Sequence, residues 1–287
     1  MEYTRLGRTG LSVSRTSFGA LPIQRIPEEQ STAILRAAYE AGINFYDTAN
    51  AYTDSEYKLG RALGDVRKNI IIATKTAPAA PELMQQRLEQ SLKMLKTDYI
   101  DIYQLHCAPK VYRPDEEDGI YDWILQKKRE GVIRHIAITA HRITVAEEAL
   151  ESGLYDTLQY PFSVLADERE IKLVQRAAAL DIGFIAMKAM AGGLIRHPLI
   201  PRVPLGEKLE QIAADGQRGP GERKHENGGQ RHPYGPFSFH GSFFLLQRGG
   251  ADARAPFRRC AQGSKPRVQG ALHFFFMHFH PTPPMLF

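Results

Sequence analysis

The sequence is poor in cysteine and lacks any long apolar run. Its 287 residues include only Cys107 and Cys260, too few for a disulfide framework or a cysteine zinc site. No stretch approaches the roughly 18 apolar residues of a membrane-spanning helix, and ALHFFFMHF near the end is much shorter. The opening MEYTRLGRTGLSVS contains no apolar core of a secretory signal. These absences predict a cytoplasmic protein in a reducing setting, without a membrane partner.

The net charge of +5 is unevenly distributed along the chain. Residues 1–200 carry 25 Lys and Arg against 26 Asp and Glu, whereas residues 201–287 carry 12 against 6. A basic excess that is confined to one segment describes that segment and says little about the fold. Nucleic acid is therefore not an expected partner of the first 200 residues.

Short runs rich in apolar and β-branched residues recur through the first 190 residues and predict buried strands. They cover residues 16–23, 43–49, 69–76, 100–106, 132–139, 156–162 and 182–188. The stretches between them have apolar residues at helical spacing. These predicted helices cover residues 27–42, 81–96, 116–131, 144–153 and 167–183. Strands that alternate with helices in this way are typical of an all-parallel α/β protein.

The sequence also lacks a glycine-rich turn after the first predicted strand, where an open dinucleotide-binding sheet would have one. Polar residues capable of chemistry stand instead at the ends of several strands: Asp47, Lys75, His106, Thr139, Gln159 and Lys188. Barrels place their active sites at the carboxyl ends of their strands. We therefore predict an α/β fold of the (β/α)8 TIM barrel type over residues 1–200, although only seven strand–helix units are legible.

Four residues near this rim each have a structural explanation when taken alone. Asp47 could cap the next turn, and Tyr52 could be a half-buried loop aromatic. Lys75 could end its strand by extending to solvent, and His106 could be a hydrogen-bonded structural residue. Their joint occurrence favours a site, because successive parallel strands bring their carboxyl ends to one rim.

Together these residues suit a proton transfer. The charge of Lys75 would lower the pKa of Tyr52 from about 10 toward neutrality, and Asp47 would hold the lysine in place. His106 could hydrogen-bond a substrate oxygen and orient it. Such a site protonates an oxygen on which negative charge is building. Hydride arriving at a carbonyl carbon is the obvious source of that charge.

The stretches that carry these residues resemble the aldo-keto reductase family. MEYTRLGRTGLSVSRTSFGALPI is similar to its amino-terminal hairpin and first strand, and INFYDTANAYTDSEYKLGRAL to its second strand and loop. IIIATKT and IDIYQLH are similar to the strands that supply its lysine and histidine. The match runs from residue 1 to about 195. It implies a catalytic tetrad of Asp47, Tyr52, Lys75 and His106, with Tyr52 donating the proton in NADPH-dependent reduction of an aldehyde or ketone.

The resemblance also implies an NADPH cofactor extended across the barrel mouth. Its contacts would be Gly19, Ala20, Asp47, Thr139, Gln159, Met187 and Lys188. Thr139 and Gln159 would hold the carboxamide, Met187 would lie against the nicotinamide ring, and Lys188 would reach the pyrophosphate. Ala140 occupies a position where many members have asparagine. No metal is expected, the partner is a small carbonyl substrate, and a monomer is favoured.

Two other functions remain open on the sequence alone. Lys75 could form a Schiff base in a barrel aldolase. Alternatively, the domain could be a nucleotide-binding regulatory module that keeps the fold and the cofactor but turns over little. Neither the substrate nor the preference between NADPH and NADH follows from the sequence.

Residues 201–287 form an atypical tail. They hold 10 of the 18 prolines, 12 of the 24 glycines and 10 of the 14 phenylalanines, and no strand–helix spacing survives. RVPL, at residues 202–205, predicts a remnant strand, and residues 206–216 predict a short helix. The tail has three interpretations: a shifted reading frame, a disordered extension, or a surface for single-stranded nucleic acid. A barrel without its eighth strand would leave two unpaired edges.

Overall fold

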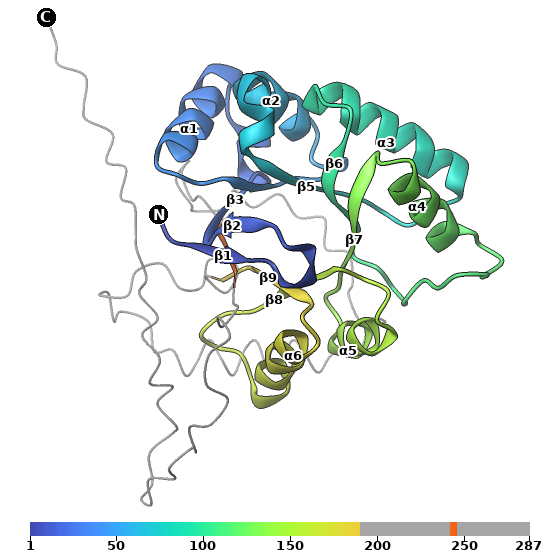
Figure 1. Ribbon diagram of the computed structural model, residues 1–287. Coiled ribbons are helices and arrows are strands. Elements are labelled where there is room, and N and C mark those ends of the chain that lie inside the picture. The colour runs from blue at the N-terminus through green and yellow to red at the C-terminus, as the bar shows by residue number, and fades with distance from the viewer. Residues whose placement is uncertain (190–241, 246–287) are drawn as a thin grey trace, which may run out of the picture. The chain divides into compact units, whose positions relative to one another are not determined.

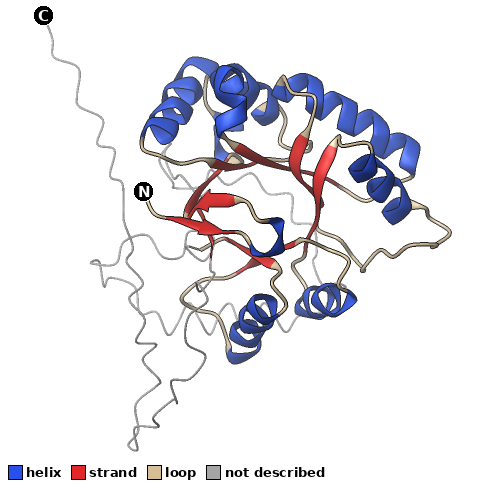
Figure 2. Ribbon diagram, viewed as in Figure 1, coloured by secondary structure: helices blue, strands red, loops and turns tan. Residues whose placement is uncertain are grey.

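The computed structural model describes residues 1–189 and 242–245. Parallel strands succeed one another around a closed barrel (Figure 2). In chain order these are β3 (Thr16–Gly19), β4 (Phe45–Asp47), β5 (Ile71–Thr76), β6 (Ile100–Leu105), β7 (Ile133–Thr139), β8 (Thr157–Pro161) and β9 (Gly183–Met187). The predicted barrel is confirmed, and each strand falls within a predicted run.

The ring is closed by β10 (Ser242–Leu245), a strand from the atypical tail. It runs antiparallel to both neighbours, with Phe244 paired to Thr16 of β3 and to Ala186 of β9. The sequence pattern did not reveal this strand, because the strand–helix spacing ends near residue 195. The predicted RVPL strand and the predicted helix at 206–216 lie outside the described residues. The interpretations of the tail therefore stay predictions.

Closure by β10 can be tested with a single proline. Phe244→Pro removes the backbone N–H that this position offers to the ladder and leaves an acceptor without its donor. We expect a loss of about 1–3 kcal/mol in the free energy of unfolding, measured by urea denaturation. Phe244→Ala, which keeps the N–H, is the control. Equal losses in the two variants would show that the strand pairing contributes nothing.

The helices lie outside the strands of the barrel (Figure 1). Five were predicted and are present: α1 (Glu28–Glu40), α3 (Pro81–Leu95), α4 (Ile120–Arg129), α5 (Ile143–Ser152) and α6 (Glu168–Ala179). A further helix, α2 (Ser55–Leu63), was predicted only as part of a loop. Within residues 1–189 and 242–245, no helix combines the length and the apolar character that crossing a bilayer requires.

Helix α2 holds the loop that carries Tyr52. A Cβ added to Gly60 would lie 2.2 Å from the carbonyl oxygen of Met94, so glycine allows α2 to pack directly on the backbone of α3. The buried ammonium of Lys58 donates to the carbonyl oxygens of Ile23 and Ile26 at 3.0 and 2.8 Å. These contacts hold α2 against α3 and against the segment that contains Ile23 and Ile26. They thereby also hold the loop that precedes α2 and carries Tyr52.

A layer of apolar side chains forms the floor beneath the barrel rim. Leu6 and Val13, from the hairpin of β1 (Tyr3–Arg5) and β2 (Ser12–Ser14), pack against this layer. Its members from the strands are Phe45, Ala73, Ile102, Ala137 and Ile185. Side chains alternate along a strand, so the next inward positions lie two residues further on. Those positions are Asp47, Lys75, Gln104, Thr139 and Met187.

A polar cluster around Asp156 ties the hairpin turn to the barrel. The Oδ2 atom of Asp156 accepts from Lys128 Nζ at 2.7 Å and from the backbone N of Ile136 at 3.0 Å. His135 Nδ1 and Arg8 Nε each lie 3.7 Å from this carboxylate. Burial acts to raise the pKa of Asp156, but the interactions with His135 and Lys128 outweigh it and lower the pKa to about 2.

The lowered pKa of Asp156 predicts a pH-dependent contribution to stability. Because the folded pKa lies below the unfolded value of about 3.9, the contribution is present above pH 4 and is lost as the pH falls toward 2. We expect Asp156→Asn to cost about 2 kcal/mol at pH 7 and progressively less below pH 4. Urea midpoints at a series of pH values test this. A constant difference at every pH would contradict the expectation.

Candidate active site

A buried ion pair between Asp47 and Lys75 is the centre of the site. Asp47 ends β4 and is fully buried, and the side chain of Lys75 in β5 is 2% exposed. Lys75 Nζ donates to Oδ2 of Asp47 at 2.5 Å and to the carbonyl oxygen of Thr48 at 2.6 Å. Burial acts to lower the pKa of Lys75, yet attraction to Asp47 and Tyr52 raises it above its ordinary value. The lysine is therefore a fixed positive charge.

Tyr52 lies beside this charge. Lys75 Nζ is 5.0 Å from the centroid of the Tyr52 ring. The loop that places it is held by Ser55, whose backbone N donates to the Tyr52 carbonyl oxygen at 2.8 Å and whose hydroxyl donates to Ala20 O at 2.8 Å. The hydroxyl of Thr48 lies 3.0 Å from that of Ser55. The loop that carries the phenol is thus held by the start of α2 and by the residues that directly follow β3 and β4.

The pKa of Tyr52 does not follow our prediction. Burial of the phenol raises the pKa above 10, and the nearby charge of Lys75, which lowers it, is not enough to reverse the shift. We predicted a lowered pKa because the sequence shows the lysine but not the extent of burial. At neutral pH the phenol is therefore protonated and can donate.

His106 completes the cluster from the end of β6. Its ring lies edge-on to that of Tyr52, with centroids 5.9 Å apart and planes at 82°. Burial, together with the charges of Lys75 and His141, lowers the pKa of His106 to about 4. The imidazole is therefore neutral at physiological pH and has one N–H to donate. The four residues predicted to act together do lie together.

Two glutamine side chains bind the second oxygen of Asp47. Nε2 of Gln104 donates to Oδ1 at 2.8 Å, and Nε2 of Gln159 donates to the same atom at 3.1 Å. Gln159 was predicted as a cofactor contact, whereas Gln104 was missed. The sequence did contain a signal for Gln104. It is a polar residue in the run IDIYQLH, two positions before His106, so both side chains belong to the same face of the strand.

The other predicted cofactor contacts occupy the same rim. Gly19 pairs with Asp47 across β3 and β4, and the backbone N of Ala20 donates to the Asp47 carbonyl oxygen at 2.8 Å. Thr139 Oγ1 accepts from the backbone N of Cys107 at 2.7 Å and so fixes the turn after His106. Met187 ends β9 and is 8% exposed.

Lys188 stands apart from the buried pair. It is exposed and follows directly after β9, with a positive φ of 56°. Its charge, added to the larger effect of burial, lowers the pKa of His141. Lys188 is therefore an exposed residue at the rim, close enough to His141 for its charge to act on that imidazole.

Glu56 is a second buried carboxylate near the site that we did not predict. It is 4% exposed, and it accepts from Thr74 Oγ1 at 2.5 Å and from Ser91 Oγ at 3.1 Å. Burial raises its pKa. Because Thr74 belongs to β5 and Ser91 to α3, Glu56 anchors the start of α2 to both elements and stabilises the loop carrying Tyr52.

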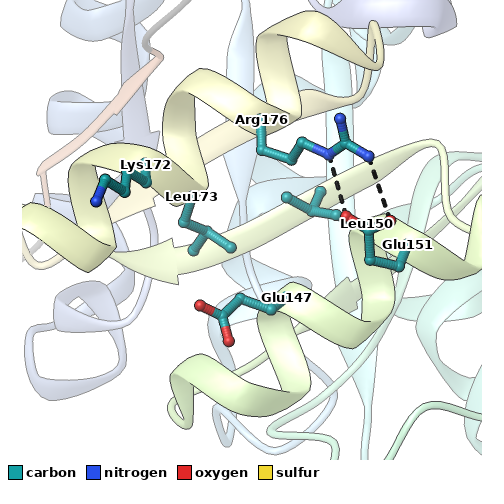
Figure 3. Close-up of a pocket in the computed structure, with 6 residues that line it drawn as sticks. All are labelled: Glu147, Leu150, Glu151, Lys172, Leu173 and Arg176. Carbon is teal, nitrogen blue, oxygen red and sulfur yellow. Dashed lines mark hydrogen bonds and ion pairs between the residues drawn. The ribbon is translucent and has the colours of Figure 1, made fainter.

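A groove of about 270 Å³ between α5 and α6 is a separate feature of the outer surface (Figure 3). It is lined by Glu147, Leu150, Glu151, Lys172, Leu173 and Arg176. Ion pairs join the two helices here, Arg176 to Glu151 at 3.0 Å and Arg169 to Glu147 at 2.7 Å. Lys172, the other charged lining residue, pairs with Glu168 within α6 at 2.9 Å. The groove contains none of the clustered rim residues.

Comparison with known proteins finds relatives of this chain by sequence. A sequence model described as the aldo/keto reductase family matches residues 16–206. L-galactose dehydrogenase of Arabidopsis thaliana is 31% identical over 242 residues, which cover 72% of this chain and 73% of that protein.

Solved structures are similar as well. The holo form of aldo-keto reductase AKR11C1 from Bacillus halodurans has a TM-score of 0.61 and 29% identity, over 70% of this chain and 71% of that chain. An aldo/keto reductase from Klebsiella pneumoniae, in complex with NADP and acetate, has a TM-score of 0.59 and 23% identity, over 75% and 76%. At that identity the second likeness concerns the fold alone.

Proposed function

The chain belongs to the aldo/keto reductase family of oxidoreductases, and from this premise we propose that it reduces an aldehyde or ketone to an alcohol with NADPH, with Tyr52 as proton donor. The observation that carries the proposal is the buried ion pair of Lys75 and Asp47 beside a protonated phenol. A general acid must hold its proton before the reaction and tolerate losing it afterwards. Burial provides the first property, and the charge of Lys75 provides the second.

When bound, NADPH would supply the hydride that the carbonyl carbon accepts. Tyr52 donates its phenolic proton to the carbonyl oxygen as negative charge develops there, which forms the alcohol and leaves a phenolate. Lys75 stabilises that phenolate, because its ammonium is held near the ring by Asp47. Neutral His106 donates a hydrogen bond to the same carbonyl oxygen and orients it.

The rim has groups that fit the nicotinamide end of the cofactor. The Oε1 atom of Gln159 is buried without a hydrogen-bond partner among the described residues, and a carboxamide NH2 is a suitable donor for it. The hydroxyl of Thr139 accepts from Cys107 and can still donate its own hydrogen. The NADP bound to the Klebsiella pneumoniae enzyme, which has the same fold, makes NADPH the first cofactor to test.

The Schiff-base alternative is disfavoured by the state of Lys75. Imine formation needs a neutral amine, usually obtained by lowering the lysine pKa. Here attraction to Asp47 and Tyr52 raises that pKa. Borohydride trapping with carbonyl compounds should therefore leave Lys75 unmodified.

The experiment is steady-state NADPH oxidation by the full-length protein with a panel of reactive aldehydes and ketones. We expect turnover with at least one compound and production of the matching alcohol. NADPH affinity is measured in parallel by fluorescence. NADPH binding without turnover of any compound would support the regulatory module instead. Failure to bind NADPH or NADH would refute the cofactor assignment.

A further inference from the structure

The carboxylate of Asp47 is held on both oxygens inside the barrel. It is fully buried, with Lys75 on Oδ2 at 2.5 Å and the amides of Gln104 and Gln159 on Oδ1 at 2.8 and 3.1 Å. A buried charge is stable only when its oxygens are hydrogen-bonded, because it has lost its contacts with water. Lys75 alone would leave Oδ1 unsatisfied.

The two amides have only one suitable orientation. An ionised carboxylate can accept but not donate, so Gln104 and Gln159 must both present Nε2 to Oδ1. Their Oε1 atoms are then left buried without partners among the described residues. An unsatisfied buried acceptor is unfavourable, and an apolar side chain of similar size would avoid it. The contact with Asp47 explains why a glutamine is used here.

The glutamines differ in what else they do. Gln104 lies opposite Lys75 in the pairing of β5 with β6, directly beside the charge that it helps to fix. Gln159 comes from β8, opposite Thr139, and it is the residue that the family resemblance places on the carboxamide. Gln104, in contrast, has no predicted role other than its contact with Asp47.

We propose that Gln104 is a positioning residue for carbonyl reduction: it holds Oδ1 of Asp47, and through Asp47 it holds the ammonium of Lys75 beside the phenol of Tyr52. Its contact does not depend on bound cofactor, whereas Gln159 would link Asp47 to the nicotinamide. This inference rests on the function proposed above.

The test compares two equivalent substitutions in the full-length protein. Gln104→Met keeps the length of the side chain and removes the donor. We expect kcat to fall about tenfold, with an unchanged KM and an unchanged Kd for NADPH. Gln159→Met should lower kcat and also weaken NADPH binding. Gln86→Met, on the exposed part of α3, is the matched control and should change neither.

A thermal double-mutant cycle makes the result independent of activity. If Gln104 acts on Asp47, the losses in Tm from Gln104→Met and Asp47→Asn should be non-additive, since both remove the same charge-assisted bond. An unchanged kcat in Gln104→Met would overturn the proposal, as would additive losses in Tm. If the wild type reduces no carbonyl compound, the proposed function fails, and the thermal cycle still decides whether Gln104 holds Asp47.

Discussion

Tyr52→Phe is expected to lower kcat for carbonyl reduction by a factor of about 10² or more, the scale of a lost general acid. The substitution removes one hydroxyl and keeps the ring that lies edge-on to His106. NADPH affinity should be nearly unchanged, because the phenol faces the substrate oxygen in the proposed mechanism. Rapid-mixing measurement of the first turnover distinguishes a slow chemical step from slow product release.

If Tyr52 has only a structural role, the opposite result is expected. The half-buried phenol would then contribute only to packing, and Tyr52→Phe would shift the Tm slightly and leave the rate alone. Tyr57→Phe, at an exposed position in α2, controls for the loss of a hydroxyl elsewhere. Undiminished carbonyl reduction by Tyr52→Phe would remove the proton-donor assignment.

Lys75→Met should impair both the rate and the fold. The rate falls because the phenolate formed by Tyr52 loses its stabilising charge, and we expect a loss of at least about 10² in kcat. The fold suffers because Asp47 is left as a buried carboxylate without its counter-charge, a situation that costs about 3–5 kcal/mol. Urea denaturation and steady-state kinetics measure the two effects separately.

The two effects can be separated by a second substitution. Lys75→Met combined with Asp47→Leu removes both charges, so part of the lost stability should return while activity stays lost. The return is partial because the amides of Gln104 and Gln159 lose Oδ1 of Asp47 as their acceptor. Asp47→Asn alone should reduce the rate less than Lys75→Met, since the ammonium remains. Recovery of activity in the double variant would show that the lysine charge is not needed for the chemistry.

The sequence predicted the barrel well because its parallel strands are buried on both faces. Runs such as NIIIATKT and IDIYQLH concentrate apolar and β-branched residues in a short stretch. The helices between them have apolar residues at helical spacing instead. Helix α2 was missed because the family resemblance assigned its residues to the loop after the second strand. In the structure, Gly60 meets the backbone of α3, and Lys58 and Glu56 are satisfied by buried partners.

The candidate site was less predictable than the fold. Strand ends pointed to Asp47, Lys75 and His106, because parallel topology determines where they meet. The pKa of Tyr52 depends on how deeply the phenol is buried, a property of the assembled barrel, and our prediction of a lowered value was wrong. Gln104 was missed because β6 also carries Asp101, and a polar residue in a strand is not distinctive until its partner, here Asp47, is known.

Closure by β10 has a consequence for the newly made chain. More than 50 residues separate Met187, the end of β9, from Ser242, the start of β10. At roughly 5–20 residues per second, a ribosome needs about 3–10 s to synthesise that interval. Throughout it, β3 and β9 are both without their closing neighbour. Exposed edges of this kind can pair with other chains, so aggregation should compete with closure during synthesis, and slower translation after residue 187 should lower the soluble yield.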